Sequence, residues 1–244
     1  MHRKEIPMKK KSKNPQRKAD VIDNSKEEQL PQLAELAYFP SMVYTMVAEN
    51  FLDTLITVSK EYVAKAESSR DLDEIYPVHQ TENFANDTRI LEFVQFISQV
   101  AWDILQRQGY AMSQYNTITH ELWCQDHHKH SGMDQHIHGN GCQISGFYFL
   151  NCPENSPKVV IHDPRQSKLY ADLPEQAVCQ ATAASQAINF TPIPGQLMVI
   201  NSWLPHSFGK NPSDETFRFI HFNISTVYNP AQISSTNINE AIII

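Results

Sequence analysis

Three potential metal ligands stand two positions apart in the segment 133–150, MDQHIHGNGCQISGFYFL. In an extended strand, residues i and i+2 point to the same face, so the imidazoles of His136 and His138 can bind one metal ion. Asp134 joins them if the strand begins early. The spacing therefore predicts a metal site, and the alternative is a pair of solvent-facing histidines on a loop.

A third ligand has to come from elsewhere in the chain, and His206 is the best candidate. It follows PIPGQLMVINSWLP, which reads as a turn, an apolar strand and a second turn. That arrangement returns a residue to the mouth of a β-barrel. Three protein ligands on one side of a metal leave positions open for a co-substrate and O₂.

Twelve positions after His206, Arg218 lies inside the β-prone run FRFIHFNIS. In a desolvated barrel its planar guanidinium can hold a carboxylate through two hydrogen bonds. The alternative is a surface arginine on an edge strand. The remaining histidines of the cluster are interpreted as structural or exposed: His120, His127, His128, His130 and His162.

Composition indicates a globular protein with an unusual charge distribution. The 244 residues are 41% hydrophobic and 10% aromatic, with a formal net charge of −7. Residues 1–20 carry eight of the 20 Lys and Arg but only two of the 27 Asp and Glu, a net of +6, which leaves −13 for the rest. An acidic body repels nucleic-acid phosphates, so nucleic acid is not expected as its partner.

Residues 1–28 are predicted to be a disordered basic tail, because little there is apolar enough to offset the entropy of ordering. No run of about 18 apolar residues predicts a membrane span, and the basic segment is not followed by the apolar core of a secretory signal. The four cysteines form no CxxC pair. We therefore expect a cytoplasmic protein with reduced thiols.

Periodicity predicts two helices followed by many short strands. Apolar spacing indicates one helix at about 47–66 and a second that Asn86 or Asp87 caps and Gly109 ends. The strand candidates are NTITHELWCQ, QISGFYFLN, KVVIHDP, INFTPI, GQLMVINS and RFIHFNIS.

This order predicts an α+β fold, a double-stranded β-helix (a jelly roll or cupin-like barrel) with the N-terminal helices packed outside. The expected domain spans 29–228, helical over 47–109 and β-structured over 110–228, with 229–244 as a second tail.

The ordered set HxH, SGFYFLN, HDPR, PxPGxLxxxxSWLPHS and RFxxFN resembles the 2-oxoglutarate- and iron(II)-dependent oxygenases. The resemblance runs from about residue 122 to 225 and is nearest to the oxygenases of phages and marine bacteria, which are similar to prolyl hydroxylases. It implies a non-haem iron dioxygenase that uses Fe(II), 2-oxoglutarate and O₂. By this resemblance the enzyme couples oxidative decarboxylation of 2-oxoglutarate to hydroxylation of a peptide or small molecule.

The resemblance also implies roles for single residues. His136 matches the first metal ligand, His206 the distal one, and Arg218 the residue that pairs with the far carboxylate of 2-oxoglutarate. His138 stands where most relatives have Asp or Glu. The second ligand is then His138, Asp134 or Asp163, and we place His138 first because its spacing puts it on the same face as His136. Three further residues are expected near the co-substrate and metal: Asn223, Ser207 and Tyr148.

Two other functions compete with this one. A cupin-type metalloprotein also uses HxH, but Gln143 stands near the position of its usual Glu, and His206 lies eleven residues past Gly195, farther than a cupin predicts. A non-enzymatic β-sandwich, structural or binding, would leave the three histidines far apart.

Overall fold

The computed structural model describes residues 33–139 and 141–229. The chain divides into two units, Met1–Phe39 and Pro40–Ile244. The described part of the first unit, residues 33–39, contains no helix or strand. The basic tail expected at 1–28 lies outside the described residues, as does all but residue 229 of the tail expected at 229–244. None of the helices in the described ranges is long and apolar enough to cross a membrane.

Both expected helices are present in the second unit, each preceded by a short 3-10 turn. Turn η1 (Glu49–Phe51) leads into α1 (Leu52–Ser69), and η2 (Thr88–Ile90) leads into α2 (Leu91–Arg107). The Asp87 side chain accepts a hydrogen bond from the backbone N–H of Arg89, as expected of a cap. Gly109, at φ 93°, ends the second helix in a left-handed conformation that suits glycine.

The strands form two antiparallel sheets. The large sheet has the order β1-β8-β5-β10-β3-β2, and the small sheet has the order β4-β9-β6-β7. Their bounds are β1 (Val43–Val47), β2 (Val78–Gln80), β3 (Tyr115–His127), β4 (Met133–His136), β5 (Cys142–Asn151), β6 (Val159–His162), β7 (Ala187–Phe190), β8 (Gln196–Asn201), β9 (His206–Phe208) and β10 (Phe217–Tyr228). Two further 3-10 turns are η3 (Met112–Gln114) and η4 (Gln166–Tyr170).

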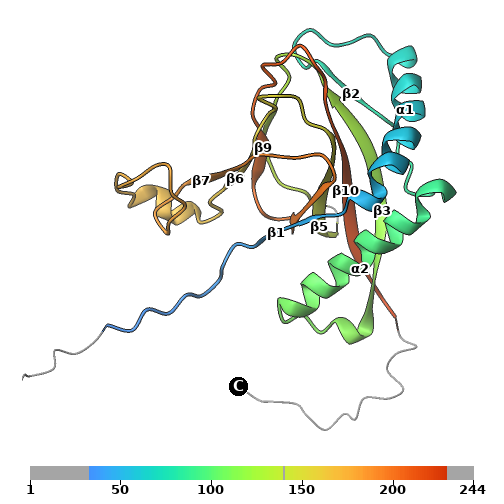
Figure 1. The fold of residues 1–244 in the computed structure, drawn as a ribbon. Helices are drawn as coiled ribbons and strands as arrows, with labels where there is room; N and C mark the ends of the chain where they lie inside the picture. Colours follow the sequence, from blue (N-terminus) through green and yellow to red (C-terminus); the bar gives the residue numbers. More distant parts are fainter. Residues whose placement is uncertain (1–32, 140, 230–244) are drawn as a thin grey trace, which may run out of the picture. The chain divides into compact units, whose positions relative to one another are not determined.

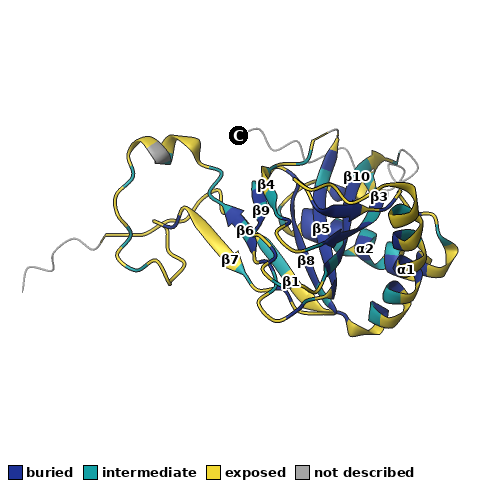
Figure 2. Cartoon of the chain, turned by 90° about the horizontal axis from the view of Figure 1, so that it is seen from above, coloured by how far each residue is buried: buried dark blue, intermediate teal, exposed yellow. Residues whose placement is uncertain are grey.

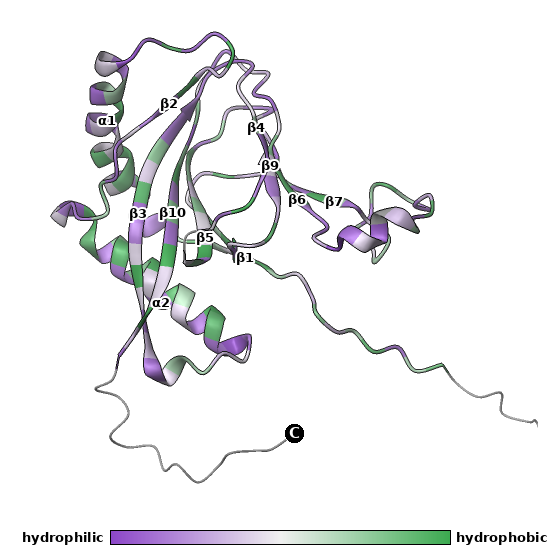
Figure 3. Cartoon of the chain, turned by 180° about the vertical axis from the view of Figure 1, so that it is seen from behind, coloured by the Kyte–Doolittle hydropathy of each residue, from purple (hydrophilic) through white to green (hydrophobic). Residues whose placement is uncertain are grey.

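The large sheet lies between two layers, the helices on one face and the small sheet on the other (Figure 1). Alternation along β10 explains this: Ile220 and Phe222 pack toward the helices, whereas Phe217 and Phe219 pack toward the small sheet. The strands at the centre of the large sheet are buried on both faces, and polar and apolar residues mix along β3 and β10 (Figures 2 and 3). This mixed arrangement, with helices outside antiparallel sheets, agrees with the α+β class expected.

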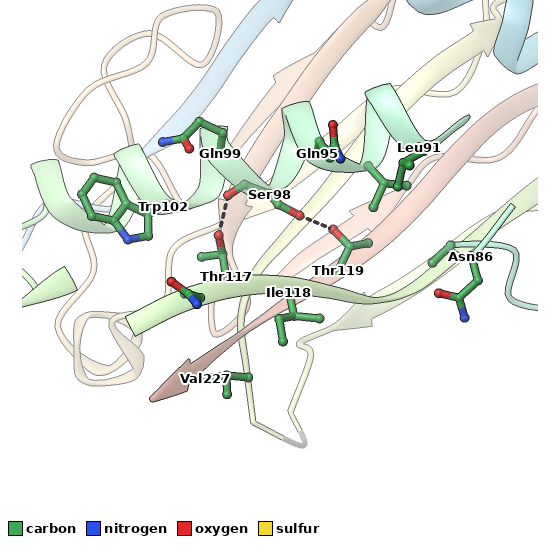
Figure 4. A pocket seen from close by; sticks show the side chains of 13 residues that line it. Asn86, Leu91, Gln95, Ser98, Gln99, Trp102, Thr117, Ile118, Thr119 and Val227 are labelled. Atoms are coloured by element: carbon green, nitrogen blue, oxygen red, sulfur yellow. Dashed lines mark hydrogen bonds between the residues drawn. The ribbon is translucent and has the colours of Figure 1, made fainter. Parts of the chain in front are cut away.

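A groove of about 870 Å³ lies between α2 and β3 on the helix side of the large sheet (Figure 4). Ser98 joins the two elements, because its hydroxyl contacts Thr119 Oγ1 at 2.9 Å and its carbonyl accepts from Thr117 Oγ1 at 2.7 Å. The groove is therefore part of the packing of α2 on the sheet.

Candidate metal centre

Strand pairing brings the three predicted histidines together. Residues His136 in β4 and His206 in β9 are directly opposed in the small sheet. His138 follows the end of β4 and is fixed by its backbone N–H, which donates to the carbonyl of Ser202 at 2.9 Å. The ligand atoms of His136, His138 and His206 all lie within 4.8 Å of one another. The separation expected of a non-enzymatic β-sandwich is therefore not observed.

Backbone carbonyls orient two of the imidazoles. His136 Nδ1 donates to the carbonyl of Asp134 at 2.7 Å, and His206 Nδ1 donates to the carbonyl of Leu204 at 3.0 Å. In a neutral imidazole this leaves the Nε2 lone pair free, which is the arrangement found in metal-binding histidines. His138 Nε2 lies 3.3 Å from His206 Nε2. Two nitrogens at ~2.1 Å from one metal are separated by roughly 3.0–3.4 Å, so this pair fits a single ion.

Burial keeps His138 and His206 neutral. It lowers the pKa of His206 to about 3, and it lowers the pKa of His138 to about 4 with a further contribution from His136. Metal binding requires an unprotonated imidazole nitrogen. Both side chains therefore remain able to bind a metal well below neutral pH.

A fourth imidazole, His221 of β10, lies against this group. Its Nε2 is 3.2 Å from His138 Nε2, and its ring stacks on Trp123 with the centroids 4.5 Å apart. It is not part of the set whose ligand atoms all lie within 4.8 Å. Two buried nitrogens here, His221 Nδ1 and Trp123 Nε1, have no hydrogen-bond partner among the described residues.

Asn223 lies two positions after His221 and belongs to a buried polar network. Its Oδ1 accepts from Ser145 Oγ at 2.8 Å, and its Nδ2 donates to Glu121 at 2.7 Å. Glu121 is also the one charged group besides the histidines that acts on His138. Asn223 is thus linked to the histidine group through Glu121.

Arg218 is not where the prediction requires it, and this expectation has to be corrected. Arg218 is two positions from Ile220 and four from Phe222, so it shares their face on the helix side of β10, opposite to His221. Its Nε and Nη2 each donate to a carboxylate oxygen of Asp126 at 2.5 Å. The guanidinium therefore does hold a carboxylate through two hydrogen bonds, but the carboxylate belongs to the protein. The charged groups that shift the pKa of His138 are His136 and Glu121, and those that lower the pKa of His206 and His221 are other histidines.

Two other predicted residues also point elsewhere. Tyr148 faces the helices, where its hydroxyl donates to the carbonyl of Ala48 at 2.7 Å and its ring packs edge-on against Phe93. Ser207 pairs with His162 Nε2 at 2.8 Å, because it alternates with His206 along β9. Each error has the same cause, which is that a neighbouring position in a strand belongs to the opposite face.

The carboxylates considered as alternatives to His138 lie outside the histidine group. Asp134 contributes only its backbone carbonyl to it and has an exposed side chain. Asp163 is held by Arg165 at 2.8 Å and Lys168 at 3.7 Å. The site that the structure assembles is therefore built from imidazoles.

His221 was not predicted as part of the site. The signal was the alternation within FRFIHFNIS, which puts 217, 219, 221 and 223 on one face and 218 on the other. If Asn223 faces the metal, alternation places His221 on the same face and Arg218 on the other.

Comparison with known families agrees with this geometry. Residues 121–223 match the model of a family described as "Putative 2OG-Fe(II) oxygenase". The match contains all three histidines, the whole small sheet, and β5 and β8 of the large sheet with parts of β3 and β10. A search among curated proteins gave no match.

Three solved structures share the fold. A prolyl-4-hydroxylase from Pseudomonas putida is 11% identical, with a TM-score of 0.51 over 76% of this chain and 92% of that one. The non-heme alpha ketoglutarate dependent epimerase SnoN from nogalamycin biosynthesis is 12% identical, with a TM-score of 0.54 over 80% and 81% of the two chains. AviO1 from Streptomyces viridochromogenes Tue57 is 13% identical, with a TM-score of 0.53 over 78% and 91%. At these identities the likeness shows a shared jelly-roll fold.

The family match over residues 121–223, the shared fold and the group of three histidines agree with one another: in this region the chain is similar to the 2-oxoglutarate- and Fe(II)-dependent oxygenases.

Proposed function

We propose that the chain is a hydroxylase-type dioxygenase built on a double-stranded β-helix, and that it couples oxidative decarboxylation of 2-oxoglutarate to hydroxylation of a peptide or an uncharged small molecule. The observation that carries the proposal is the group His136, His138 and His206, with all ligand atoms within 4.8 Å. Two of these imidazoles already donate their Nδ1–H to backbone carbonyls, which leaves Nε2 available.

His136, His138 and His206 are the residues that would hold the metal. Bound there, Fe(II) supplies positions for 2-oxoglutarate and O₂ and the redox chemistry of the decarboxylation. The protein fixes the direction of the imidazoles through the carbonyls of Asp134 and Leu204. Three neutral ligands leave the centre one charge more positive than two histidines and a carboxylate do, which favours an anionic co-substrate.

The far carboxylate of 2-oxoglutarate needs hydrogen-bond donors, and Arg218 points away from the site. Trp123 Nε1 and His221 Nδ1 are buried, unpartnered, and carried by rings that stack on each other beside His138. We assign the recognition of this carboxylate to these two nitrogens. Neutral donors in a dry site bind a carboxylate through charge-assisted hydrogen bonds without a full countercharge.

The substrate class is inferred from a pocket of about 440 Å³ near the metal centre. One of its lining residues, Ser202, accepts the backbone N–H of His138, and another, Trp203, lies three positions before His206. The lining also includes Tyr110, Met112 and Tyr115 and contains no charged residue. Aromatic and apolar walls with a few amide and hydroxyl groups suit a neutral substrate such as a peptide segment.

Turnover of 2-oxoglutarate tests the proposal. The iron-loaded protein is expected to form succinate from 2-oxoglutarate in air, slowly alone and faster with a peptide or small molecule that it hydroxylates. His136→Ala should abolish succinate formation, whereas His130→Asn should not. His130 is exposed, and asparagine tolerates its φ of 69°. Turnover that is equal in His136→Ala and the parent protein would refute the assignment.

A further inference from the structure

A second group of metal-binding side chains lies at the C-terminal end of α1, apart from the histidine group of the oxygenase site. The ligand atoms of Glu67, His79 and His128 all lie within 4.8 Å of one another. Glu67 is in the last part of α1, His79 is in β2, and His128 directly follows β3. Three elements of the fold therefore converge on one point.

The ring nitrogens of the two histidines are arranged as in a metal site. His79 Nε2 lies 3.2 Å from the carbonyl of Arg70, which can only accept, so Nε2 carries the proton and Nδ1 the lone pair. That Nδ1 lies 3.1 Å from His128 Nε2. Two nitrogens on one ion at ~2.1 Å are roughly 3.0–3.4 Å apart, and a backbone carbonyl behind the ligand is the usual way to orient it.

The surrounding charges favour a cation. His79, Asp126 and Arg218 form a row across β2, β3 and β10, in which Asp126 and Arg218 neutralise each other. Among the three side chains of the group, Glu67 supplies the negative charge, while Arg70, which follows α1, donates to the carbonyl of Val78. Glu67 also lies near the negative end of the α1 dipole, and the last turn of this helix contains no basic residue.

We propose that Glu67, His79 and His128 form a second divalent-cation site, suited to Zn²⁺, that fastens the end of α1 to β2 and β3. Two imidazoles and a carboxylate with one position left for water is a common zinc ligand set. In the metal-free protein, His128 Nε2–H donates to His79 Nδ1, and metal binding would replace this bond as His128 takes the tautomer that carries its proton on Nδ1.

Zinc titration of the full chain tests the proposal independently of oxygenase activity. The double variant His136→Ala/His138→Ala disables the first group, and a chromophoric chelator then reports competition for Zn²⁺. We expect this double variant to bind one Zn²⁺ per chain and to gain thermal stability when zinc is added. Glu67→Gln or His128→Ala, added to it, should weaken zinc binding at least tenfold and remove the thermal shift.

Two controls keep the test decisive. Glu67 is exposed, so Glu67→Gln should retain the fold, which circular dichroism verifies. His130→Asn changes an exposed histidine two positions from His128 that belongs to neither group, and it should bind zinc as tightly as the double variant. Absence of zinc binding in the double variant would overturn the proposal, as would equal affinity after Glu67→Gln and His128→Ala together.

Discussion

His138 Nε2 and His206 Nε2 lie 3.3 Å apart although 68 positions separate the two residues. The pairing of β4 with β9 produces this contact, because it sets His136 opposite His206 and carries His138 past the strand end. The site is therefore assembled by the sheet and not by local sequence. Single substitutions should remove one ligand without removing the sheet.

His138 is expected to act as the second metal ligand and to be replaceable by a carboxylate. His138→Ala should weaken binding of Fe(II) or Co(II) by about 100-fold, whereas His138→Asp should restore most of it as a two-histidine, one-carboxylate site. Anaerobic titration calorimetry measures both, with His130→Asn as the control. Unchanged affinity in His138→Ala would transfer the ligand role to Asp134 or Asp163.

Arg218→Met should reduce stability and leave the co-substrate site intact. The substitution leaves Asp126, whose side chain is 2% exposed, as an unpaired buried carboxylate. Breaking such a pair typically costs about 3–5 kcal/mol, and removing both charges costs less. Denaturant unfolding should show this loss, with partial recovery in Asp126→Leu/Arg218→Met. If 2-oxoglutarate binding falls tenfold at unchanged stability, Arg218 contacts the co-substrate after all.

Trp123→Phe should weaken 2-oxoglutarate binding to the iron-loaded, anaerobic protein by about tenfold or more, because a hydrogen bond to a charged group contributes about 1.5–3 kcal/mol. The aromatic stack on His221 is largely kept. Trp102→Phe is the matched control, since Trp102 Nε1 donates to the carbonyl of Tyr115 on the helix side. Equal affinity in both variants would remove Trp123 from the co-substrate site.

The metal-free protein should lose stability as the pH falls below neutrality. Burial lowers the pKa of His127 to about 3 from 6.5, so protons bind the unfolded chain first, and stability present above pH 6.5 is lost as the pH falls toward 3. One such group lowers the free energy of unfolding by about 2 kcal/mol at pH 5 relative to pH 7. His127 lies among the rings of Phe208, Phe217 and Phe219. The substitution His127→Phe should therefore remove this part of the pH-dependent loss of stability. Unfolding curves at pH 5 and 7 check this, and equal pH dependence in both proteins would contradict it.

Much of the fold could be predicted because the segments are long or strongly patterned. The helices, the cap at Asp87 and the strand runs that became β3, β5, β8 and β10 follow from periodicity and turn residues. The short strands β2 and β9, of three residues each, carry no such pattern, and their pairing depends on distant partners. The ligands could be predicted because His136 and His138 are two apart, although β4 ends at His136.

The surroundings of the metal centre were harder to predict, since they depend on which face each strand residue occupies. Arg218 and Tyr148 were assigned to the metal site by their distance in sequence from a motif. Both instead lie on the face of the large sheet that packs against the helices. The role of a strand residue depends on which face of the sheet it occupies. That face can be assigned only when one other residue of the same strand has already been placed on a face.

The most direct test of the central claim is the visible absorption spectrum of the anaerobic protein with Fe(II) and 2-oxoglutarate. Chelation of the keto acid to iron held by His136, His138 and His206 should give a weak charge-transfer band at one iron per chain. The band should disappear when O₂ is admitted, and it should be absent in His206→Ala. Tightly bound iron without a band, or a band that persists in His206→Ala, would contradict the account.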